Sequence, residues 1–185
     1  MISSKKLQAM KILQEEYKNL VRSPMVVFGI TVGLFDENDI FNWKCTISGP
    51  KDTCYKGGLF TLRIQFPDNY PDCKPEIAFM TPIYHLNVKF TAGGGQPIGH
   101  VCFSSINSWN SDYRINKLLP EIFYLFKANN PDSPYDYMDN RRRNEYVNNR
   151  DLFYKKAEYF TKKYANPLGN RKEYPNGWDF TYNGQ

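Results

Sequence analysis

Apolar residues in the first part of the chain recur with the period of an amphipathic helix. Over residues 4–22 they stand three or four positions apart, which places them on one stripe of a helix. The stripe consists of Leu7, Met10, Leu13, Tyr17, Leu20 and Val21. Ser4 is the expected N-cap, and Arg22-Ser23-Pro24 ends the helix because proline restricts the residue before it.

The next part of the chain has a period of two, which is typical of β-strands with one buried face. A weak alternation over residues 26–35 leads into a turn at 36–39, and a short apolar run covers 77–80. Between them, two strands carry the inward-facing residues Phe41, Trp43, Cys45 and Ile47, and then Phe60, Leu62, Ile64 and Phe66. The pattern predicts a four-stranded antiparallel meander whose apolar face needs a cover.

Helical spacing returns in the second half of the chain. One stripe consists of Ile115, Leu118, Leu119, Ile122, Leu125 and Phe126. Pro120 lies inside it, where a proline costs ~3 kcal/mol or kinks the helix, so we expect a distortion or a late helix start. A second stripe, which predicts the last helix, consists of Phe153, Ala157, Phe160 and Tyr164. Helices that flank a meander sheet give an α+β fold.

A single domain accounts for a chain of 185 residues, which is long enough to bury a core. We assign residues 1–166 to this domain. Residues 167–185 are rich in Pro and Gly, and we interpret them as a short irregular tail. The sequence contains no internal repeat and no sign of a second domain.

Composition and charge exclude several classes of protein. The 14 Tyr, 13 Phe and 3 Trp argue against disorder. No apolar run approaches the ~18 residues of a membrane span, and the N-terminus does not resemble a secretory signal, so we expect a cytoplasmic or nuclear protein. Of the net charge of +5, residues 141–172 carry ten Lys or Arg against three Asp or Glu. No nucleic-acid-binding motif accompanies them, so we interpret a solvated basic face and expect no nucleic acid partner.

One cysteine is set apart from the others by its context. The chain has four: Cys45, Cys54, Cys73 and Cys102. They form no CxxC pair, so we expect thiols in a reducing compartment, and neither zinc ligands nor disulfides. Cys102 follows a Pro-rich segment, 66–83, that cannot form a long helix, and the glycines Gly93–Gly95. This context is typical of a scaffold that presents a thiol.

The order of landmarks around Cys102 resembles the ubiquitin-conjugating enzyme family, whose signature is His-Pro-Asn followed by Gly-x-Ile/Val-Cys. The landmarks are Phe66-Pro67, Tyr70-Pro71, Lys74-Pro75, Phe79, Tyr84-His85-Leu86-Asn87, Gly99-His100-Val101-Cys102 and Trp109. The resemblance extends from about Leu7 to about Ala165 and implies the α+β fold of that family.

The resemblance implies cysteine thioester chemistry without a cofactor. Cys102 would take ubiquitin from the activating enzyme, in an ATP-dependent pathway, and pass it to a substrate lysine or a ligase. An ordinary thiol with a pKa of ~8.5 is only a few per cent ionised at neutral pH, which suffices when the partner delivers an activated thioester. No acid–base dyad is evident, and we interpret His100 as a strand-side histidine rather than a base.

Further site residues are implied by the tripeptide and by a later loop. Asn87 takes the place of the family's Asn, which caps a turn and donates to the oxyanion that forms when an amine attacks the thioester. His85 is expected to fix the loop by hydrogen bonding. Ser133 falls where the family has an Asp or Ser that gates the site, and Asp132 is its neighbour.

The expected partners are ubiquitin, the activating enzyme and a ligase, with the chain itself a monomer and no membrane partner. The family's first helix contacts the activating enzyme and ligases, which implies docking roles for Lys5, Lys6 and Lys11. The implied ligase surface also contains Pro71, Asp72, Trp109 and Ser111. Asp72 stands where many members have a Phe that inserts into RING-type ligases, so we predict weak use of those ligases.

The sequence also departs from the family around the site. Leu86 replaces the proline of the tripeptide, which removes one source of loop rigidity. Asn87 precedes Cys102 by fifteen residues, more than is usual, and residues 92–96 form the insertion. We interpret this insertion as a flexible flap, because no Gly-Lys-Ser/Thr follows that would indicate phosphate binding. Ser104, two residues after Cys102, stands where Asp is common in the family.

Two alternatives to a ubiquitin-conjugating enzyme stay open at this point. One is a non-catalytic scaffold or ubiquitin-binding subunit with the same fold, although such relatives usually lack the cysteine that this chain retains. The other is the same thioester chemistry with a ubiquitin-like modifier.

Overall fold

A computed structural model describes residues 2–91, 95–101, 104–129, 140–168 and 178–184, without the side chains of 104 and 105. Its strands are β1 (Ile30–Leu34), β2 (Asn42–Ser48), β3 (Leu59–Gln65) and β4 (Glu76–Phe79). Its helices are α1 (Ser4–Arg22), the 3₁₀ helix η1 (Val26–Phe28), α2 (Ser104–Asn107), α3 (Ile115–Leu125), α4 (Asn140–Asn148) and α5 (Arg150–Tyr164). No described helix is both long enough and apolar enough to cross a bilayer.

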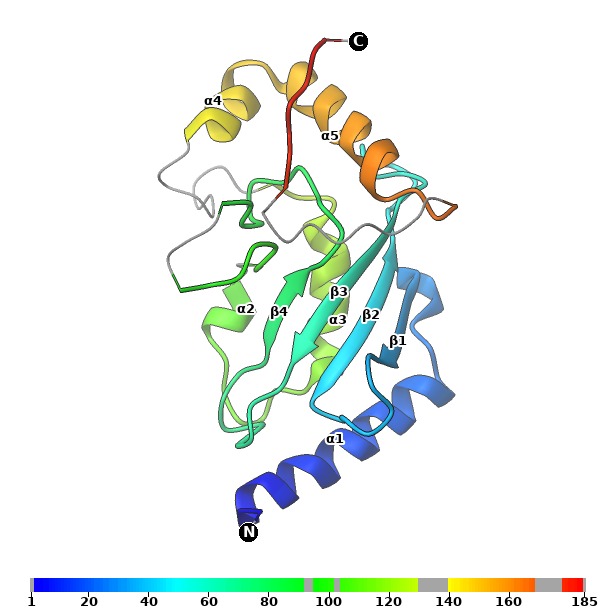
Figure 1. Cartoon of the computed structure of the whole chain (residues 1–185), viewed down its shortest axis with the longest axis vertical. Coiled ribbons are helices and arrows are strands. Elements are labelled where there is room, and N and C mark those ends of the chain that lie inside the picture. The colour runs from blue at the N-terminus through cyan, green and yellow to red at the C-terminus, as the bar shows by residue number, and fades with distance from the viewer. Residues whose placement is uncertain (1, 92–94, 102–103, 130–139, 169–177, 185) are drawn as a thin grey trace.

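The four strands form the predicted antiparallel meander, in the order β1-β2-β3-β4 (Figure 1). The register places Cys45 opposite Leu62, and Ile64 opposite Ile77. Because these four residues share one face, the period-two pattern of the sequence corresponds to burial on that face. The α+β fold is thereby confirmed.

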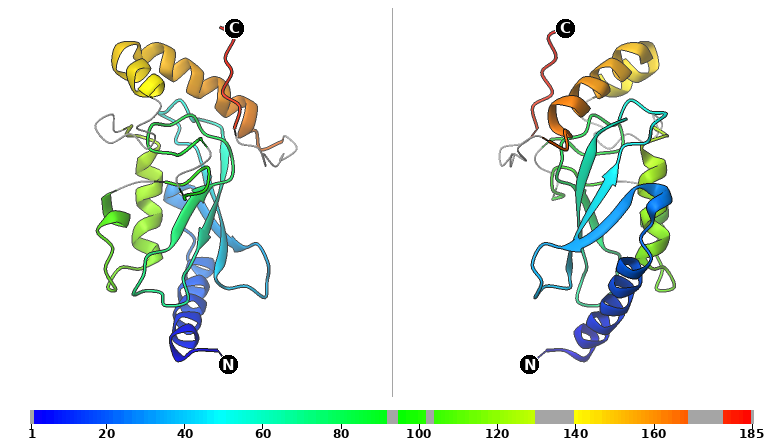
Figure 2. Two further views of the ribbon diagram at one scale, coloured as in Figure 1. Left: turned by 60° about the vertical axis from the view of Figure 1, so that its left-hand side comes forward. Right: turned by 90° about the vertical axis from the view of Figure 1, so that its right-hand side faces the viewer.

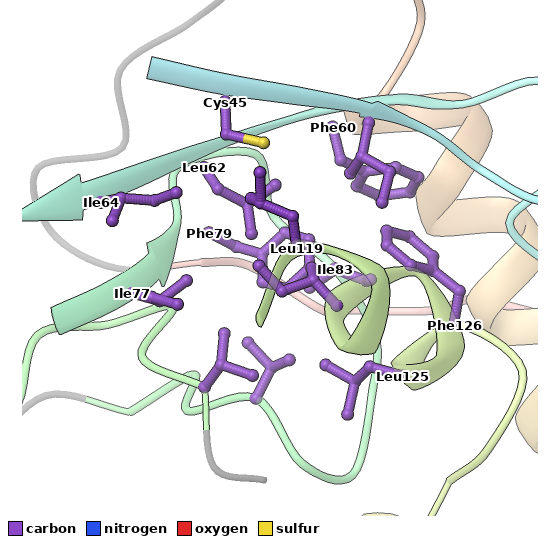
Figure 3. Packing of buried hydrophobic residues seen from close by; sticks show 14 of the residues in the cluster. Cys45, Phe60, Leu62, Ile64, Ile77, Phe79, Ile83, Leu119, Leu125 and Phe126 are labelled. Carbon is purple, nitrogen blue, oxygen red and sulfur yellow. The ribbon is translucent and has the colours of Figure 1, made fainter. Parts of the chain in front are cut away.

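Helix α3 covers the apolar face of the sheet, while α1 lies at one end of the molecule and α4 and α5 at the other (Figures 1 and 2). Figure 3 shows Leu119 and Phe126 pointing from the α3 side toward Phe60, Leu62 and Phe79 of the strands. The rings of Phe60 and Phe126 meet edge to face with their centroids 5.0 Å apart. This geometry is the one that aromatic quadrupoles favour, and it adds specificity to the packing.

Helix α1 has the predicted bounds but a different N-cap and a narrower buried stripe. The hydroxyl oxygen of Ser3, not Ser4, accepts a hydrogen bond from Lys6 N (3.2 Å). Leu7 and Val21 are 45 % and 50 % exposed, because the N-terminal part of the helix projects beyond the sheet (Figure 1) and Val21 faces outward. The buried residues of the helix are Ala9, Leu13 and Leu20.

Helix α3 passes through Pro120, so the expectation of a late start at this residue is wrong. The helix begins at Ile115, whose backbone N–H donates to a carboxylate oxygen of Glu16 in α1 (3.1 Å). A carboxylate at this end of a helix satisfies a free N–H group and lies favourably in the helix dipole. This tertiary contact stabilises the start of the helix, which lies upstream of the proline.

The sequence pattern missed helix α4 and the packing of the C-terminal segment. In α4 the buried residues are Arg142 and Tyr146, which form no apolar stripe. Residues 178–184 have no regular secondary structure, as expected for a tail. Their aromatic side chains nevertheless pack against the hydrophobic core: Trp178, Phe180 and Tyr182.

Candidate active site

The backbone just before the predicted nucleophile is bound to the outer edge of β4. Val101 N donates to Ile77 O (3.1 Å), and Phe79 N donates to Gly99 O (2.8 Å). Gly99 has a φ of +87°, and a Cβ there would lie 1.9 Å from Phe79 O. Only glycine fits at this position, because the two backbones approach closely and φ is positive. The edge of β4 is thus covered by residues 99–101.

A second hydrogen-bonded connection joins this segment to the loop that carries the tripeptide. Lys89 N donates to His100 O (3.0 Å), and Gly99 N donates to Lys89 O (2.7 Å). The buried Lys89 side chain also donates from Nζ to Gln96 O (2.6 Å). These bonds close the base of the Gly-rich insertion, of which Ala92, Gly93 and Gly94 lie outside the described residues.

The same pairing joins the sequence neighbours of two candidate residues. Val88, the residue after Asn87, forms an antiparallel bridge with Val101, the residue before Cys102. Asn87 is 4 % exposed, so its side chain is held in the folded body. Cys102 itself lies outside the described residues, as do the predicted gate residues Asp132 and Ser133.

His85 is fully buried and hydrogen-bonded on both ring nitrogens. Its Nε2 lies 2.8 Å from Leu125 O, and its Nδ1 accepts from Asn87 N (3.0 Å). Since a carbonyl only accepts, Nε2 carries the proton and Nδ1 is the acceptor. Burial lowers the pKa of His85 to about 4, and the charge of Arg142 adds to this lowering. The imidazole is therefore neutral at pH 7 and bound in the way that a loop-fixing role requires.

Other residues far away in the sequence hold the same loop. The Tyr55 hydroxyl donates to Tyr84 O (2.9 Å), and Leu86 N donates to the Asn129 side-chain oxygen (3.1 Å). The Leu86 side chain is 1 % exposed, so the residue that replaces the family's proline is part of the core. Sequence reasoning missed these contacts, because nothing local marks Tyr55 or Asn129 as a partner of this loop.

A buried arginine from α4 completes the set of contacts. Arg142 donates from Nη1 to His85 O (2.9 Å) and from Nη2 to Val88 O (3.2 Å). Its guanidinium carbon lies 3.5 Å from the centroid of the Phe90 ring. Sequence reasoning assigned this residue only to the basic segment 141–172.

His100 has the surroundings of a strand residue. It is half-buried and bridges Ala78 of β4. Burial lowers the pKa of His100, and the cationic Lys74 and Lys89 lower it further. A neutral histidine in this position agrees with the strand-side interpretation made from the sequence.

The cysteines in the described part of the chain differ in their capacity to ionise. Burial raises the pKa of Cys45 to about 12, and it raises the pKa of Cys54 to about 11. Neither thiol forms an appreciable amount of thiolate at pH 7. Cys73 is exposed, and its sulfur accepts a hydrogen bond from the Asn69 side chain (3.0 Å). No cluster of His, Cys, Asp and Glu that could hold a metal occurs among these described residues.

Most of the predicted partner-binding residues gather on one surface. Lys5 forms an ion pair with Asp72 (3.4 Å), and Lys6 forms one with Asp68 (2.9 Å). The Trp109 indole donates to Pro71 O (2.8 Å), which brings the segment around Trp109 to the same place. The remaining two predicted residues, Lys11 and Ser111, are exposed.

Comparisons with known proteins agree with this geometry. The profile described as ubiquitin-conjugating enzyme matches residues 12–161. Ubiquitin-conjugating enzyme E2 13 of Arabidopsis thaliana is 32 % identical over 170 residues, which cover 84 % of this chain and 95 % of that protein. Ubiquitin-conjugating enzyme E2 7 of the same plant is 32 % identical over 166 residues, again 84 % of this chain and 95 % of the relative.

The chain is also similar to a viral protein and to a protein of known structure. The ubiquitin-conjugating enzyme E2 of African swine fever virus is 30 % identical over 151 residues, 77 % of this chain and 66 % of the viral protein. A crystal structure from Plasmodium yoelii, assigned as a ubiquitin conjugating enzyme, is 32 % identical with a TM-score of 0.71, covering 88 % of this chain and 96 % of that one. The profile match spans most of the chain, and the sheet, the buried tripeptide loop and the paired segment before Cys102 fit it: the protein belongs to the ubiquitin-conjugating enzyme family.

Proposed function

We propose that Cys102 is the residue on which this ubiquitin-conjugating enzyme carries ubiquitin. The bridge between Val88 and Val101 supports the proposal most directly, because it joins the residue after Asn87 to the residue before Cys102. The high pKa values of Cys45 and Cys54 also disfavour these thiols as acceptors.

The chemistry consists of two acyl transfers. The Cys102 thiolate attacks the carbonyl of the ubiquitin thioester on the activating enzyme, and the cysteine thiolate of that enzyme leaves. A substrate lysine amine then attacks the new thioester and loses its proton, an oxyanion forms, and the Cys102 thiolate leaves. A ligase cysteine can take the ubiquitin in place of the lysine.

Asn87 is proposed to stabilise the oxyanion of the second transfer. A neutral amide donor stabilises developing negative charge without acting as a competing base. The burial of Asn87 and the bond from its backbone N–H to His85 give the donor a fixed environment. Ser133, with Asp132 beside it, is proposed to gate the access of the incoming lysine.

Three further properties stay predictions: that the protein is a monomer, that it is cytoplasmic or nuclear, and that its domain ends at residue 166.

The test is a charging reaction with activating enzyme, ATP and ubiquitin, read on a non-reducing gel. We expect a band heavier by one ubiquitin that thiol reductant removes. Cys102→Ala abolishes this band, Cys102→Ser retains the fold and forms at most a reductant-resistant ester, and the exposed-thiol control Cys73→Ser charges normally. Normal charging of Cys102→Ala would show that another thiol is the acceptor.

The same reaction separates the two steps and the modifiers. Asn87→Ala should charge normally but discharge to free lysine more slowly, by on the order of 10²-fold if it provides one oxyanion donor. Equal slowing of charging and discharge would contradict that role. Replacing ubiquitin by a ubiquitin-like modifier should give no band, since the family match favours ubiquitin.

A further inference from the structure

The tripeptide that contains Asn87 has Leu86 where the family has a proline, yet two carbonyls of its loop are bound by one side chain. Arg142 donates to His85 O (2.9 Å) and to Val88 O (3.2 Å), the carbonyls on either side of Asn87 and Leu86. A planar guanidinium that binds two acceptors fixes their separation and orientation, which a single point donor cannot do.

Arg142 is itself firmly held. Its side chain is 5 % exposed, and its guanidinium carbon lies 3.5 Å from the Phe90 centroid and 5.7 Å from the Tyr84 centroid. A buried charge is tolerated only where hydrogen bonds and other contacts replace water. These two carbonyls and two rings belong to residues 84–90, so the burial of Arg142 and the shape of this loop depend on each other.

The charge of Arg142 also favours the hydrogen bond that Asn87 N donates to His85 Nδ1. Burial is the main cause that lowers the pKa of His85, and the charge of Arg142 lowers this pKa further. A neutral imidazole keeps Nδ1 as the acceptor for Asn87 N, whereas an imidazolium would present a second donor there.

We propose that Arg142 is a positioning residue for Asn87, and that it supplies from α4 the rigidity that the family's tripeptide obtains from proline. This inference rests on the proposed oxyanion role of Asn87. Arg142 makes and breaks no bond in the reaction. It holds the backbone on both sides of Asn87, so that the amide is already aimed when the oxyanion forms.

The test compares single-turnover discharge of the ubiquitin thioester to free lysine in Arg142→Ala, Asn87→Ala and the double variant. Arg142→Ala should charge to the wild-type extent but discharge at least about tenfold more slowly, less than the effect of losing the donor itself. Because Arg142 acts through Asn87, the double variant should discharge at the Asn87→Ala rate. Multiplied effects of the two substitutions would overturn the inference.

Two controls separate positioning from a general loss of stability. Ile30→Ala removes a buried side chain from β1, the opposite edge of the sheet, and should lower the urea midpoint without slowing discharge. Arg142→Lys keeps the charge but not the two-point contact, so it should fold and still discharge slowly. Guanidinium ion at millimolar concentration should partly restore discharge in Arg142→Ala.

The outcomes distinguish this inference from the function on which it rests. Wild-type discharge by Arg142→Ala and Arg142→Lys, with slow discharge by Asn87→Ala, would overturn the role of Arg142 alone. Wild-type discharge by Asn87→Ala would overturn the oxyanion role, and with it the reason for positioning. Slow discharge by Ile30→Ala would show that stability, not loop geometry, controls the rate.

Discussion

At the scale of single residues, the charge state of one buried histidine determines how the tripeptide loop is bound. Neutral His85 donates from Nε2 to Leu125 O and accepts at Nδ1 from Asn87 N. Protonation would turn the acceptor into a donor that faces another donor and would place a second cation near Arg142. The loop is therefore compatible with only one of the two charge states.

The expected result is a loss of stability in acid that depends on His85. Its folded pKa of about 4 lies below the unfolded value of ~6.5, so the unfolded chain takes up the proton first. The contribution of neutral His85 to the free energy of unfolding is complete above about pH 6.5. It declines as the pH falls toward 4, by on the order of 3 kcal/mol in all. Urea unfolding of the wild type and of His85→Gln across this pH range measures the loss of stability, which should be smaller in the variant.

Nuclear magnetic resonance provides a direct check, because the chain has only two histidines. The ring resonances of His85 should stay constant down to about pH 5, while those of half-buried His100 provide the internal comparison. Titration of His85 near pH 6.5 in the folded protein would contradict the prediction.

At the scale of elements, the C-terminal segment is part of the aromatic core beside the site. The Phe180 ring lies 4.9 Å from Phe160 of α5 and 5.3 Å from Tyr84, centroid to centroid. The neighbouring Asp179 accepts a hydrogen bond from Tyr164 at its carbonyl oxygen and forms an ion pair with Lys163 (3.8 Å). The segment thus connects the last helix to the loop that leads into the tripeptide.

Phe180→Ala should destabilise the protein although it lies in an irregular segment. Truncating a buried Phe costs 3–5 kcal/mol, and because Phe180 is only half-buried we expect about 2 kcal/mol. Equilibrium urea unfolding measures the loss. Leu168→Ala is the matched control, since Leu168 is 95 % exposed and its truncation should change little. Equal midpoints for Phe180→Ala and the wild type would show that the segment contributes nothing to the fold.

At the scale of the whole molecule, three segments that are distant in sequence meet beside the predicted partner surface. Glu16 of α1 accepts hydrogen bonds from the Tyr70 hydroxyl (3.0 Å) and from Ile115 N (3.1 Å), so one carboxylate joins α1, the loop after β3 and the start of α3. Lys5 of α1 also forms an ion pair with Asp72 of the same loop (3.4 Å), and both side chains are exposed. The surface exists only when all three segments are in place.

Asp72→Phe should strengthen binding to RING-type ligases. The Asp72 carboxylate is largely exposed, and its ion pair with Lys5 contributes little to stability. An aromatic anchor in an apolar pocket is worth on the order of 1–2 kcal/mol, so affinity should rise about tenfold. Titration of a RING domain with wild type, Asp72→Phe and the charge-removal control Asp72→Ala measures the change. Ordinary affinity in the wild type, with no gain from the Phe, would contradict the prediction.

Elements with a regular apolar period were predictable from the sequence. Strands β2, β3 and β4 and helices α1, α3 and α5 bury residues at regular spacing, because one side of each faces the same core, whereas β1 buries only Ile30. The family resemblance was also recognisable from the sequence, since its motifs, which include Tyr84, His85 and Gly99, are short and follow one another in the chain. The bounds and caps were less exact: Ser3 replaces Ser4 as the N-cap because the local signal does not distinguish two adjacent serines.

The tertiary structure alone decided how the tripeptide loop is held. Helix α4 escaped prediction because its buried face contains Arg142 and Tyr146, and a buried arginine contradicts the apolar pattern that marks a core helix. Likewise, nothing local shows that Phe180 packs on Tyr84. Periodicity reports which side of an element is buried, whereas the partner of a buried polar or aromatic group lies far along the chain. The sequence by itself therefore determined the fold class and the family, and the folded chain determined what positions Asn87.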